Sequence, residues 1–484
     1  MKIKAYLTIY LTFSLTILLS VIMVLLAGIK KNTTRMEEEV ALNTAGWSAL
    51  AEYHQELLKQ YDLFFIDTSY GSSYPGIEAI GDHVKEYANR NLSDTKLLDG
   101  RLALIDIQEA EIATDDGGEV LKQQIIEYEE NYLGLETIEN LFSKYREAEK
   151  ETIDEKGLIK EKDENAAKLE AQKAPVRVVE KEQDERENDG TETCEETEEV
   201  PIEDPAAHVN ELRKKGVLNL VVENTEKISD KAVRLEEYVS RRSSLLQGTG
   251  SLQKTAEKSL LAESKEKILL NAYIFQKFGY YGNEKENAAL DYQVEYMIGG
   301  KKSDMENLKA VVNRLLLFRE AANAAYLYGD AAKRAEISAM AASVAAVTLA
   351  PYLQPLLETS ILFAWAYIES IQDVKLLLEG GKVPLLKTAS DWRTDLNSIL
   401  NFSGDSVDRG TEKGLTYQEY LAMLLLAEKE EKLLFPMMDI MEMDIRKTAY
   451  NENFRMDGCV SGFKVLAEFE DSSGGCSFIR TFCY

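Results

Sequence analysis

Three short stretches of the sequence carry residue types that could do chemistry. Ser251–Lys254 (SLQK) matches the Ser-x-x-Lys pattern, in which the lysine activates the serine, but the accompanying Lys-Thr-Gly is absent. Asp115–Gly118 (DDGG) could suggest Ca²⁺, but the ligand spacing of a Ca²⁺ loop is missing, which favours a turn. Gly380–Pro384 (GGKVP) resembles a phosphate-binding loop, although glycines just after a helix are ordinary C-caps.

The longer catalytic and cofactor patterns are missing from the sequence. It contains no Gly-x-x-x-x-Gly-Lys, Gly-x-Gly-x-x-Gly, His-Glu-x-x-His or Cys-x-x-Cys motif. Carboxylates are too abundant for any pair to stand out as acid and base. His54 has no second metal ligand one turn away. We therefore expect a non-enzymatic protein with no catalytic residue, no metal and no cofactor.

The composition narrows the class of protein further. The 484 residues include 56 Lys+Arg and 84 Asp+Glu, a net charge of −28, which argues against nucleic acid as a partner. An apolar share of 45% is that of a globular protein, and four cysteines are too few for a disulfide-dense scaffold. The length has room for two or three domains.

A membrane segment is the clearest feature of the sequence. Ala5–Ile29 has no charged residue, and at 1.5 Å per residue it reaches about 37 Å, enough to cross a hydrocarbon core of about 30 Å. The alternative is a secretory signal, but Leu25–Ala27 does not provide the small-x-small cleavage site. We therefore predict an uncleaved anchor with the lipid bilayer as partner, preceded by a short tail over 1–4. Basic residues are nearly balanced on its two sides, so charge alone does not orient it.

The anchor is expected to continue as a stalk helix over 30–66. Along one side of this helix, mostly apolar residues alternate at intervals of four and three, which is the heptad spacing of a coiled coil. We call this row of residues the seam. Two alternatives stay open: the seam packs on the protein's own globular part, or it packs on a similar helix of a partner subunit, as in a homo-oligomer and coiled coil. The seam consists of Met36, Val40, Asn43, Trp47, Leu50, His54, Leu57 and Tyr61, in which Asn43 and His54 are the polar members.

The middle of the chain changes character twice. Residues 67–148 are expected to form the first part of an ectodomain, with a strand at Leu102–Ile112 and a helix at Glu119–Tyr145. Residues 149–204 hold 21 acidic and 9 basic side chains and no aromatic, which predicts an acidic, partly disordered linker carrying a free Cys194. Residues 205–450 are expected to be a helical ectodomain, apart from one short strand at Val217–Val222.

One stretch in the helical region is uncharged over enough residues to be considered as a second membrane span. Ile337–Leu357 has no charged residue, so a second membrane span is an alternative. It is rich in Ala, Ser and Thr and contains two prolines, and alanine gains little from insertion into lipid. A buried, soluble helical hairpin is therefore favoured.

The last part of the chain, 451–484, alternates with a period of two. This pattern predicts a C-terminal β-hairpin with a turn at Asp471–Gly475. Cys459, Cys476 and Cys483 lie on or beside it, and one disulfide is possible, with the pairing open. The expected fold is α+β and mostly α: a transmembrane helix, a stalk, a helical-bundle ectodomain and a small antiparallel β element.

Several stretches together resemble an uncharacterised bacterial family of single-pass membrane proteins. The family accompanies tight-adherence (Flp-type) pilus or type II secretion-like loci, beside pilin-like and minor pseudopilin-like proteins. The resemblance implies a cytoplasmic N-terminus, an extracytoplasmic bulk and no catalytic residues. The glycine cleavage point and early glutamate of a processed prepilin are absent here. The stretches that carry the resemblance are Met36–Asp67, Leu290–Leu327, Ile368–Trp392, Gly414–Leu426 and Phe454–Glu470.

These observations favour a membrane-anchored, pilin-like or assembly component of a surface appendage or secretion machine. Its partners would be pilin-like or secretion-machine membrane proteins. The alternative is an extracytoplasmic sensor or ligand-binding receptor, which is weakened by the very short tail before the anchor. A membrane-tethered hydrolase would need a site that the sequence does not show.

Overall fold

The computed structural model describes most of the chain as two compact units. The first unit comprises Met1–Ile138, Arg234–Lys277 and Lys429–Tyr484, and the second comprises Glu139–Val233 and Phe278–Glu428. The fold is mostly helical with a small antiparallel sheet, as the sequence predicted. The described residues are 2–93, 100–133, 155–171, 173–175, 199–201, 207–214, 216–222, 225–249, 252, 260–347, 350–402, 413–472 and 474–484.

The first unit joins segments from both ends of the sequence. It therefore does not follow the consecutive segments 67–148, 205–450 and 451–484 expected from composition. Its elements are α1 (Lys2–Leu50), α2 (Gln55–Tyr61), β1 (Ile66–Asp67), α3 (Glu78–Ser93), β2 (Arg101–Ile112), η1 (Asp115–Gly117), a helix over 119–133, η3 (Leu235–Glu237), α8 (Leu260–Lys277), α15 (Glu431–Arg446), η5 (Met456–Gly458), β5 (Cys459–Glu470) and β6 (Cys476–Cys483).

The long helix α1 ends earlier than the stalk expected over 30–66. It stops at Leu50, and a new short helix, α2, begins at Gln55. The reason is a local cap: His54 has extended backbone angles, and its Nδ1 accepts a hydrogen bond from the amide of Leu57 at 3.1 Å. A side chain that satisfies a free helix amide in this way starts a helix, so the heptad spacing continues across a break in the backbone.

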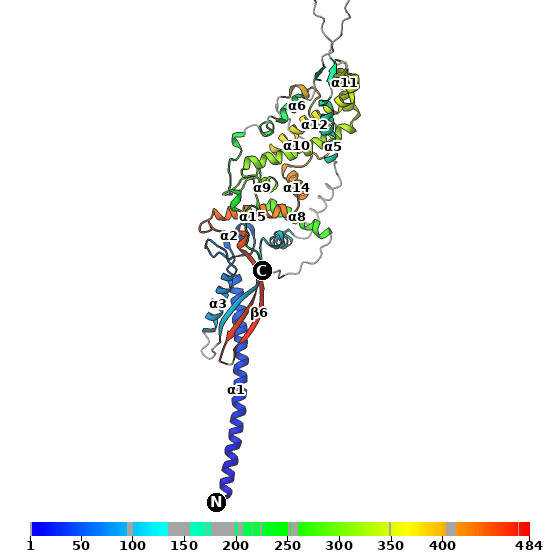
Figure 1. The fold of residues 1–484 in the computed structure, drawn as a ribbon. Helices are drawn as coiled ribbons and strands as arrows, with labels where there is room; N and C mark the ends of the chain where they lie inside the picture. Colours follow the sequence, from blue (N-terminus) through cyan, green and yellow to red (C-terminus); the bar gives the residue numbers. More distant parts are fainter. Residues whose placement is uncertain are drawn as a thin grey trace, which may run out of the picture. The chain divides into compact units, whose positions relative to one another are not determined.

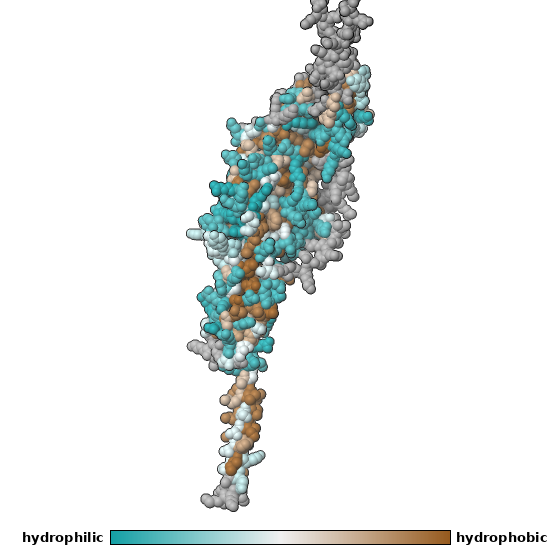
Figure 2. All heavy atoms as spheres, in the orientation of Figure 1, coloured by the Kyte–Doolittle hydropathy of each residue, from teal (hydrophilic) through white to brown (hydrophobic). Residues whose placement is uncertain are grey.

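The length and composition of α1 fit a membrane anchor. Among the described residues, it is the one helix long and apolar enough to cross a membrane, a test that a signal sequence near the N-terminus also passes. Figure 2 shows hydrophobic side chains exposed along the N-terminal part of α1.

The sheet of the first unit is antiparallel and centred on β5. β5 pairs with β2 along one edge, with β6 along the other, and with β1 at its first residues. The predicted strand at Leu102–Ile112 is β2, and the predicted C-terminal hairpin is β5–β6. Inward and outward side chains alternate along the outer part of β5, as a half-buried strand requires.

The core of this unit lies where α1 and α3 pack against the sheet (Figure 1). Small residues on α1, such as Ala41, Ala45 and Ala49, are buried in this core, and Gly46 allows the helix backbone to approach the ring of Phe482 on β6. The core residues are Ala41, Leu42, Ala45, Ala49, Leu50, Ile66, Ile77, Ile80, Val84, Ala88, Leu92, Leu102, Ala110, Ile112, Val460, Phe463, Val465, Ala467, Phe469, Phe478 and Phe482.

Two long antiparallel helices, α10 and α12, pack side by side at the centre of the second unit, and the sides that face each other are buried. The predicted strand at Val217–Val222 is wrong: these residues form the short helix α7, which buries Leu218 and Val221. The elements are α5 (Glu155–Glu170), β3 (Lys173–Pro175), β4 (Glu199–Pro201), α6 (Ala207–Lys214), α7 (Leu218–Val221), η2 (Thr225–Lys227), α9 (Gln293–Gly299), α10 (Asp304–Gly329), α11 (Ala331–Val347), η4 (Pro351–Leu353), α12 (Gln354–Leu378), α13 (Ser398–Asn401) and α14 (Tyr417–Ala427).

Two sequence predictions fall in this unit. The uncharged stretch Ile337–Leu357 is divided between α11 and α12, which pack on each other as a hairpin, with Ser338 Oγ donating to Glu358 at 2.7 Å. The expected burial is wrong for α11, which buries Ile337, Ala341 and Ala345 and leaves its other side exposed. In the acidic stretch 149–204, the described residues form α5 and the β3–β4 pair. Cys194 lies outside the described residues.

Candidate functional site

The seam predicted along the stalk divides into two environments. Met36, Val40 and Trp47 are exposed, with 68%, 55% and 59% of their surface accessible. Leu50 at the end of α1 is buried, and so are Leu57 and Tyr61 of α2. Asn43 and His54 are half-buried. The first half of the seam therefore faces away from the protein's own core, and the second half lies within it.

The exposed half of the seam continues into the apolar run of α1. Leu11 and Trp47 are 36 residues apart, which is ten turns at 3.6 residues per turn, so both lie on the same side of the helix. We call this side the stalk face. All its members are exposed: Leu11, Leu18, Ile22, Leu25, Ile29, Met36, Val40 and Trp47.

The side of α1 next to the stalk face, about 100° around the helix from it, packs on the sheet. Gly46 lies against the ring of Phe482, and a Cβ at Gly46 would come within 2.2 Å of that ring. The edge of Trp47 meets the same ring, with a centroid distance of 6.0 Å. Arg480 of β6 also forms an ion pair with Glu39 of α1. These contacts, made beside the stalk face and by Trp47 itself, fix its orientation.

The three C-terminal cysteines are separate free thiols. The strand register places Cys476 opposite Phe469 and Cys483 opposite Gly462, so no two of the cysteines face each other across the hairpin. Cys459 is buried at the start of β5. It lies three residues, about 10 Å along the strand, from Gly462, which pairs with Cys483, and ten residues, about 33 Å, from Phe469, which pairs with Cys476. The hairpin therefore does not bring any two of them to disulfide distance.

Burial makes two of these thiols poor nucleophiles. Burial raises the pKa of the Cys459 thiol well above its usual value. Burial and the nearby Glu38 carboxylate, which accepts a hydrogen bond from the thiol at 2.8 Å, raise the pKa of Cys476 to about 12. Cys483 is exposed.

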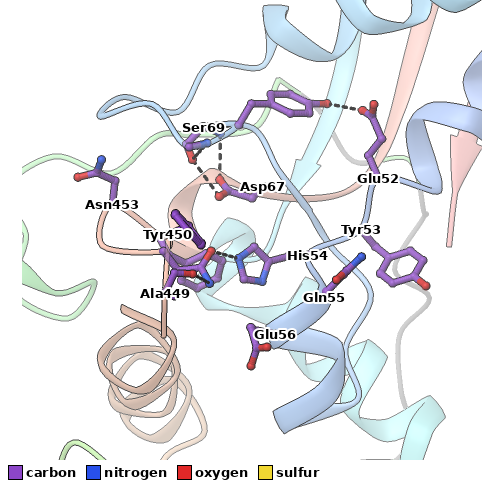
Figure 3. A pocket seen from close by; sticks show the side chains of 14 residues that line it. Glu52, Tyr53, His54, Gln55, Glu56, Asp67, Ser69, Ala449, Tyr450 and Asn453 are labelled. Carbon is purple, nitrogen blue, oxygen red and sulfur yellow. Dashed lines mark hydrogen bonds between the residues drawn. The ribbon is translucent and has the colours of Figure 1, made fainter. Parts of the chain in front are cut away.

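A pocket of about 390 Å³ lies in the first unit just beyond the end of α1 (Figure 3). His54 stands in its wall, and its ring nitrogens are both engaged: Nδ1 accepts from Leu57, and Nε2 lies 3.1 Å from the Asn451 side-chain oxygen. This arrangement fits a neutral ring with its proton on Nε2. Asp67 accepts two hydrogen bonds from Ser69, which lower the pKa of its carboxyl group. Burial has the larger, opposite effect, so the pKa of Asp67 is raised.

Glu52 forms the other side of the pocket. Its carboxylate accepts hydrogen bonds from the hydroxyls of Tyr70 at 3.1 Å and Tyr87 at 2.5 Å, and it pairs with His83 Nδ1 at 3.0 Å. The rings of Tyr70 and His83 stack at 4.0 Å. These contacts fix the direction of the carboxylate and of the Tyr70 ring.

The second unit contains a buried ionic cluster between α10 and α12. Asp373 accepts from Arg319 Nε at 3.1 Å, from Arg393 Nη1 at 2.9 Å and from Lys387 Nζ at 2.6 Å. Burial alone would raise the pKa of Asp373, but Lys387 and Arg319 lower it to about 2. Lys387 also pairs with Glu369. The cluster holds three cations, Arg319, Lys387 and Arg393, and two carboxylates, Asp373 and Glu369. These ion pairs connect α10 to α12 and to the segment that follows α12.

Glu295 of α9 is a second buried carboxylate in this unit. Its Oε1 accepts from the Tyr281 amide at 3.0 Å and the Tyr417 hydroxyl at 2.8 Å. Within the described part of the chain, its Oε2 is buried without a hydrogen-bond partner. Burial, partly opposed by these two donors, raises the pKa of Glu295 to about 7.

This raised pKa predicts a pH-dependent stability. The carboxyl binds its proton more tightly in the folded chain than its usual value of 4.5, so its contribution is fully present below pH 4.5 and is lost as the pH rises through about 7. At about 1.4 kcal/mol per pKa unit, the loss is at least roughly 2 kcal/mol. We expect Glu295→Gln to flatten denaturation profiles between pH 5 and pH 8, whereas replacing the exposed Glu286 by glutamine should leave them unchanged. An unaltered profile in the Glu295 variant would contradict the assignment.

Two of the three short motifs that could have done chemistry, Gly380–Pro384 and Asp115–Gly118, lie in the described part of the chain and have ordinary structural roles. Gly380 and Gly381 cap the end of α12, with their amides bonded to Leu377 and Leu376 carbonyls. Asp115 closes a turn by accepting from the Ile112 amide at 2.8 Å. Ser251 and Lys254 lie outside the described residues. Among the residues that the structure describes, no group of three His, Cys, Asp or Glu side chains is arranged to hold a metal.

Comparison with known proteins gives one match. A family model described as a family of unknown function, DUF5702, covers residues 195–471, more than half of the chain. The chain belongs to this family. No curated protein and no solved structure matches it. The DUF5702 region includes all of α10, α12, α15 and β5, while α1 and the stalk face lie before it.

Proposed function

We propose that this DUF5702 protein is a non-enzymatic, membrane-anchored component of a surface appendage or secretion machine of the tight-adherence type, acting through helix–helix and ectodomain contacts. The stalk face is the observation that carries the proposal. Beyond the apolar run, where α1 packs on α3 and the sheet, Met36, Val40 and Trp47 remain exposed. They lie in line with the apolar residues of the proposed membrane segment, with Asn43 as a polar member of the stripe.

A stripe of this kind favours a partner anchored in the same membrane. Met36, Val40 and Trp47 stand in water beyond the apolar run, where exposed apolar surface is unfavourable and typically marks an interaction site. A helix that rises from the same bilayer can cover both halves of the stripe at once. A pilin-like or secretion-machine helix, or the stalk of a second copy, has this property.

Two substitutions on the stalk face test the proposal. The double variant Met36→Glu, Val40→Glu places two charges on the stripe and leaves the buried side of α1 untouched. We expect the wild-type protein to co-purify from native membranes with pilin-like or secretion-machine proteins, and the variant to recover at least tenfold less of them. Leu104→Glu, a change at a half-exposed leucine on β2, is the matched control and should keep the partners. Recovery of no such partner by the wild type would refute the proposal.

The proposed orientation has its own test. We place the N-terminus in the cytoplasm and both units outside, and Cys483 is exposed near the end of the first unit. A membrane-impermeant thiol reagent should label Cys483 in intact cells, and the signal should fall in the Cys483→Ser variant. Labelling of Cys483 only after the cells are permeabilised would place this unit inside.

The pocket at the end of α1 favours a second candidate function, an extracytoplasmic ligand-binding receptor. Its walls bring charged, polar and aromatic side chains from three separate segments together around one cavity, as convergent polar groups do in small-molecule sites. Ligand binding by the isolated protein, without recovery of assembly partners, would favour this alternative.

A further inference from the structure

The charged side chains that line the pocket beyond α1 are all carboxylates. Glu52, Glu56 and Asp67 contribute three carboxylates to its wall. Among the described residues that line it, none is a lysine or arginine, and His54 uses both ring nitrogens in hydrogen bonds that fit its neutral form. Just outside the wall, Lys59 lies 3.5 Å from Glu56 and His83 lies 3.0 Å from Glu52, and both of these contacts are partly exposed to solvent. The wall itself therefore presents carboxylates and no lysine or arginine to a ligand that enters the pocket.

The rest of the wall is aromatic. Tyr53, Tyr70, Tyr450 and Phe454 all line the pocket. An aromatic ring attracts a cation to its face, and this attraction strengthens when the cation is partly withdrawn from water. Carboxylates that set the charge, together with rings that cover an apolar body, are the features that recognise an organic ammonium ion.

Two of these tyrosines are held in an unusual backbone conformation. Tyr70 and Tyr450 have φ of +47° and +69°, in the left-handed region that favours glycine. Hydrogen bonding to Glu52 fixes Tyr70, whereas Tyr450 is 91% exposed at the pocket rim and gains little from packing. Glycine would relieve the backbone strain at residue 450, so stability of the fold does not explain a tyrosine there.

We propose that this pocket binds a small organic ammonium ion. The charge is recognised by the Glu52, Glu56 and Asp67 carboxylates, and the apolar body of the ligand lies against the tyrosine rings. The inference is independent of the assembly function proposed above, and it gives the receptor alternative a class of ligand.

The position of the pocket favours a soluble ligand over a lipid headgroup. Leu50, where α1 ends, is 21 residues beyond Ile29, the last residue of the apolar run. At 1.5 Å per residue this is about 30 Å along the helix axis. A headgroup in the bilayer that holds the anchor would not reach that far.

Titration calorimetry on the full chain in a maltoside detergent tests the proposal with two matched pairs of probes. Choline is compared with 3,3-dimethylbutan-1-ol, which has the same shape without the charge, and butylammonium is compared with butan-1-ol. We expect at least one ammonium to bind ten times more tightly than its neutral partner, with affinity falling as salt rises. If neither ammonium exceeds its neutral partner, the proposal is overturned.

Two variants connect binding to the pocket. Tyr450→Gly should weaken the bound ammonium by about tenfold, within the range of a cation–aromatic contact, while thermal unfolding stays the same or moves to higher temperature. Glu56→Gln should weaken binding as well, because it removes one of the three carboxylates. Tyr74→Gly is the control, since Tyr74 is 82% exposed and does not line the pocket. Unchanged affinity in the Tyr450 and Glu56 variants would place the ligand elsewhere and contradict the inference.

Discussion

Replacing Asp373 by alanine is expected to lower the free energy of unfolding of the second unit by about 3–5 kcal/mol. Asp373 is fully buried and accepts hydrogen bonds from Arg319, Arg393 and Lys387. Removing it leaves the cationic side chains in a low-dielectric interior with one carboxylate, Glu369, remaining among them. An uncompensated buried charge destabilises far more than the loss of a surface pair.

The measurement is denaturant unfolding of the full chain followed by tryptophan fluorescence. Two of the three tryptophans, Trp365 and Trp392, belong to the second unit and lie next to this cluster. Glu164→Gln is the control, because Glu164 forms an exposed ion pair with Lys160 in the same unit, and such pairs contribute about 0–1 kcal/mol. Equal effects of the two substitutions would show that the buried cluster is not a source of stability.

Replacing Gly46 by valine is expected to destabilise the first unit by about 3 kcal/mol, the upper end of the usual range for overpacking. The first added carbon would come within 2.2 Å of the Phe482 ring. That ring cannot move freely, because it is 2% exposed and packs against Phe463 at a centroid distance of 5.5 Å. Either α1 moves away from the sheet or the hairpin distorts.

A second substitution and a control make this result specific. Gly46→Val combined with Phe482→Ala should recover part of the lost stability, so the two effects should not add. Gly28→Ala on the same helix has no atom within 4 Å of the added carbon and should be neutral. Limited proteolysis at the junction of α1 and the sheet provides the readout. If the double variant loses the full sum of the two single losses, the close approach of α1 and Phe482 is not the cause.

Periodicity predicted the elements that are regular over many residues. The alternation of apolar and polar residues after Cys459 predicted β5 and β6, and the long apolar run predicted α1. Each pattern repeats often enough to exclude other secondary structures. The end of α1 at Leu50 was not predictable in the same way. Leu57 and Tyr61 keep the helical spacing of the seam, and only the cap made by His54 separates α1 from α2.

The pocket could not be found from sequence, because its parts are far apart. Residues 52–56, 67–71 and 449–454 meet only after β5 pairs with β1, and none of these segments carries a recognisable motif. The ionic cluster did leave a signal. Glu369 and Asp373 stand four residues apart in the mostly apolar stretch of α12 from Ile361 to Leu378, and charges at such positions must find partners inside the fold.

The central place of β5 has a consequence for how the protein is made. This strand leaves the ribosome about 350 residues after β2, the partner along its longer edge, and after both segments of the second unit. Throughout that interval, the sheet-facing side of α1 has no strand to cover it. Nascent chains that stall before β5 would display Leu42 and its neighbours to quality-control proteases, whereas finished chains conceal them. We therefore expect truncated chains that lack β5 to be degraded faster than the full chain.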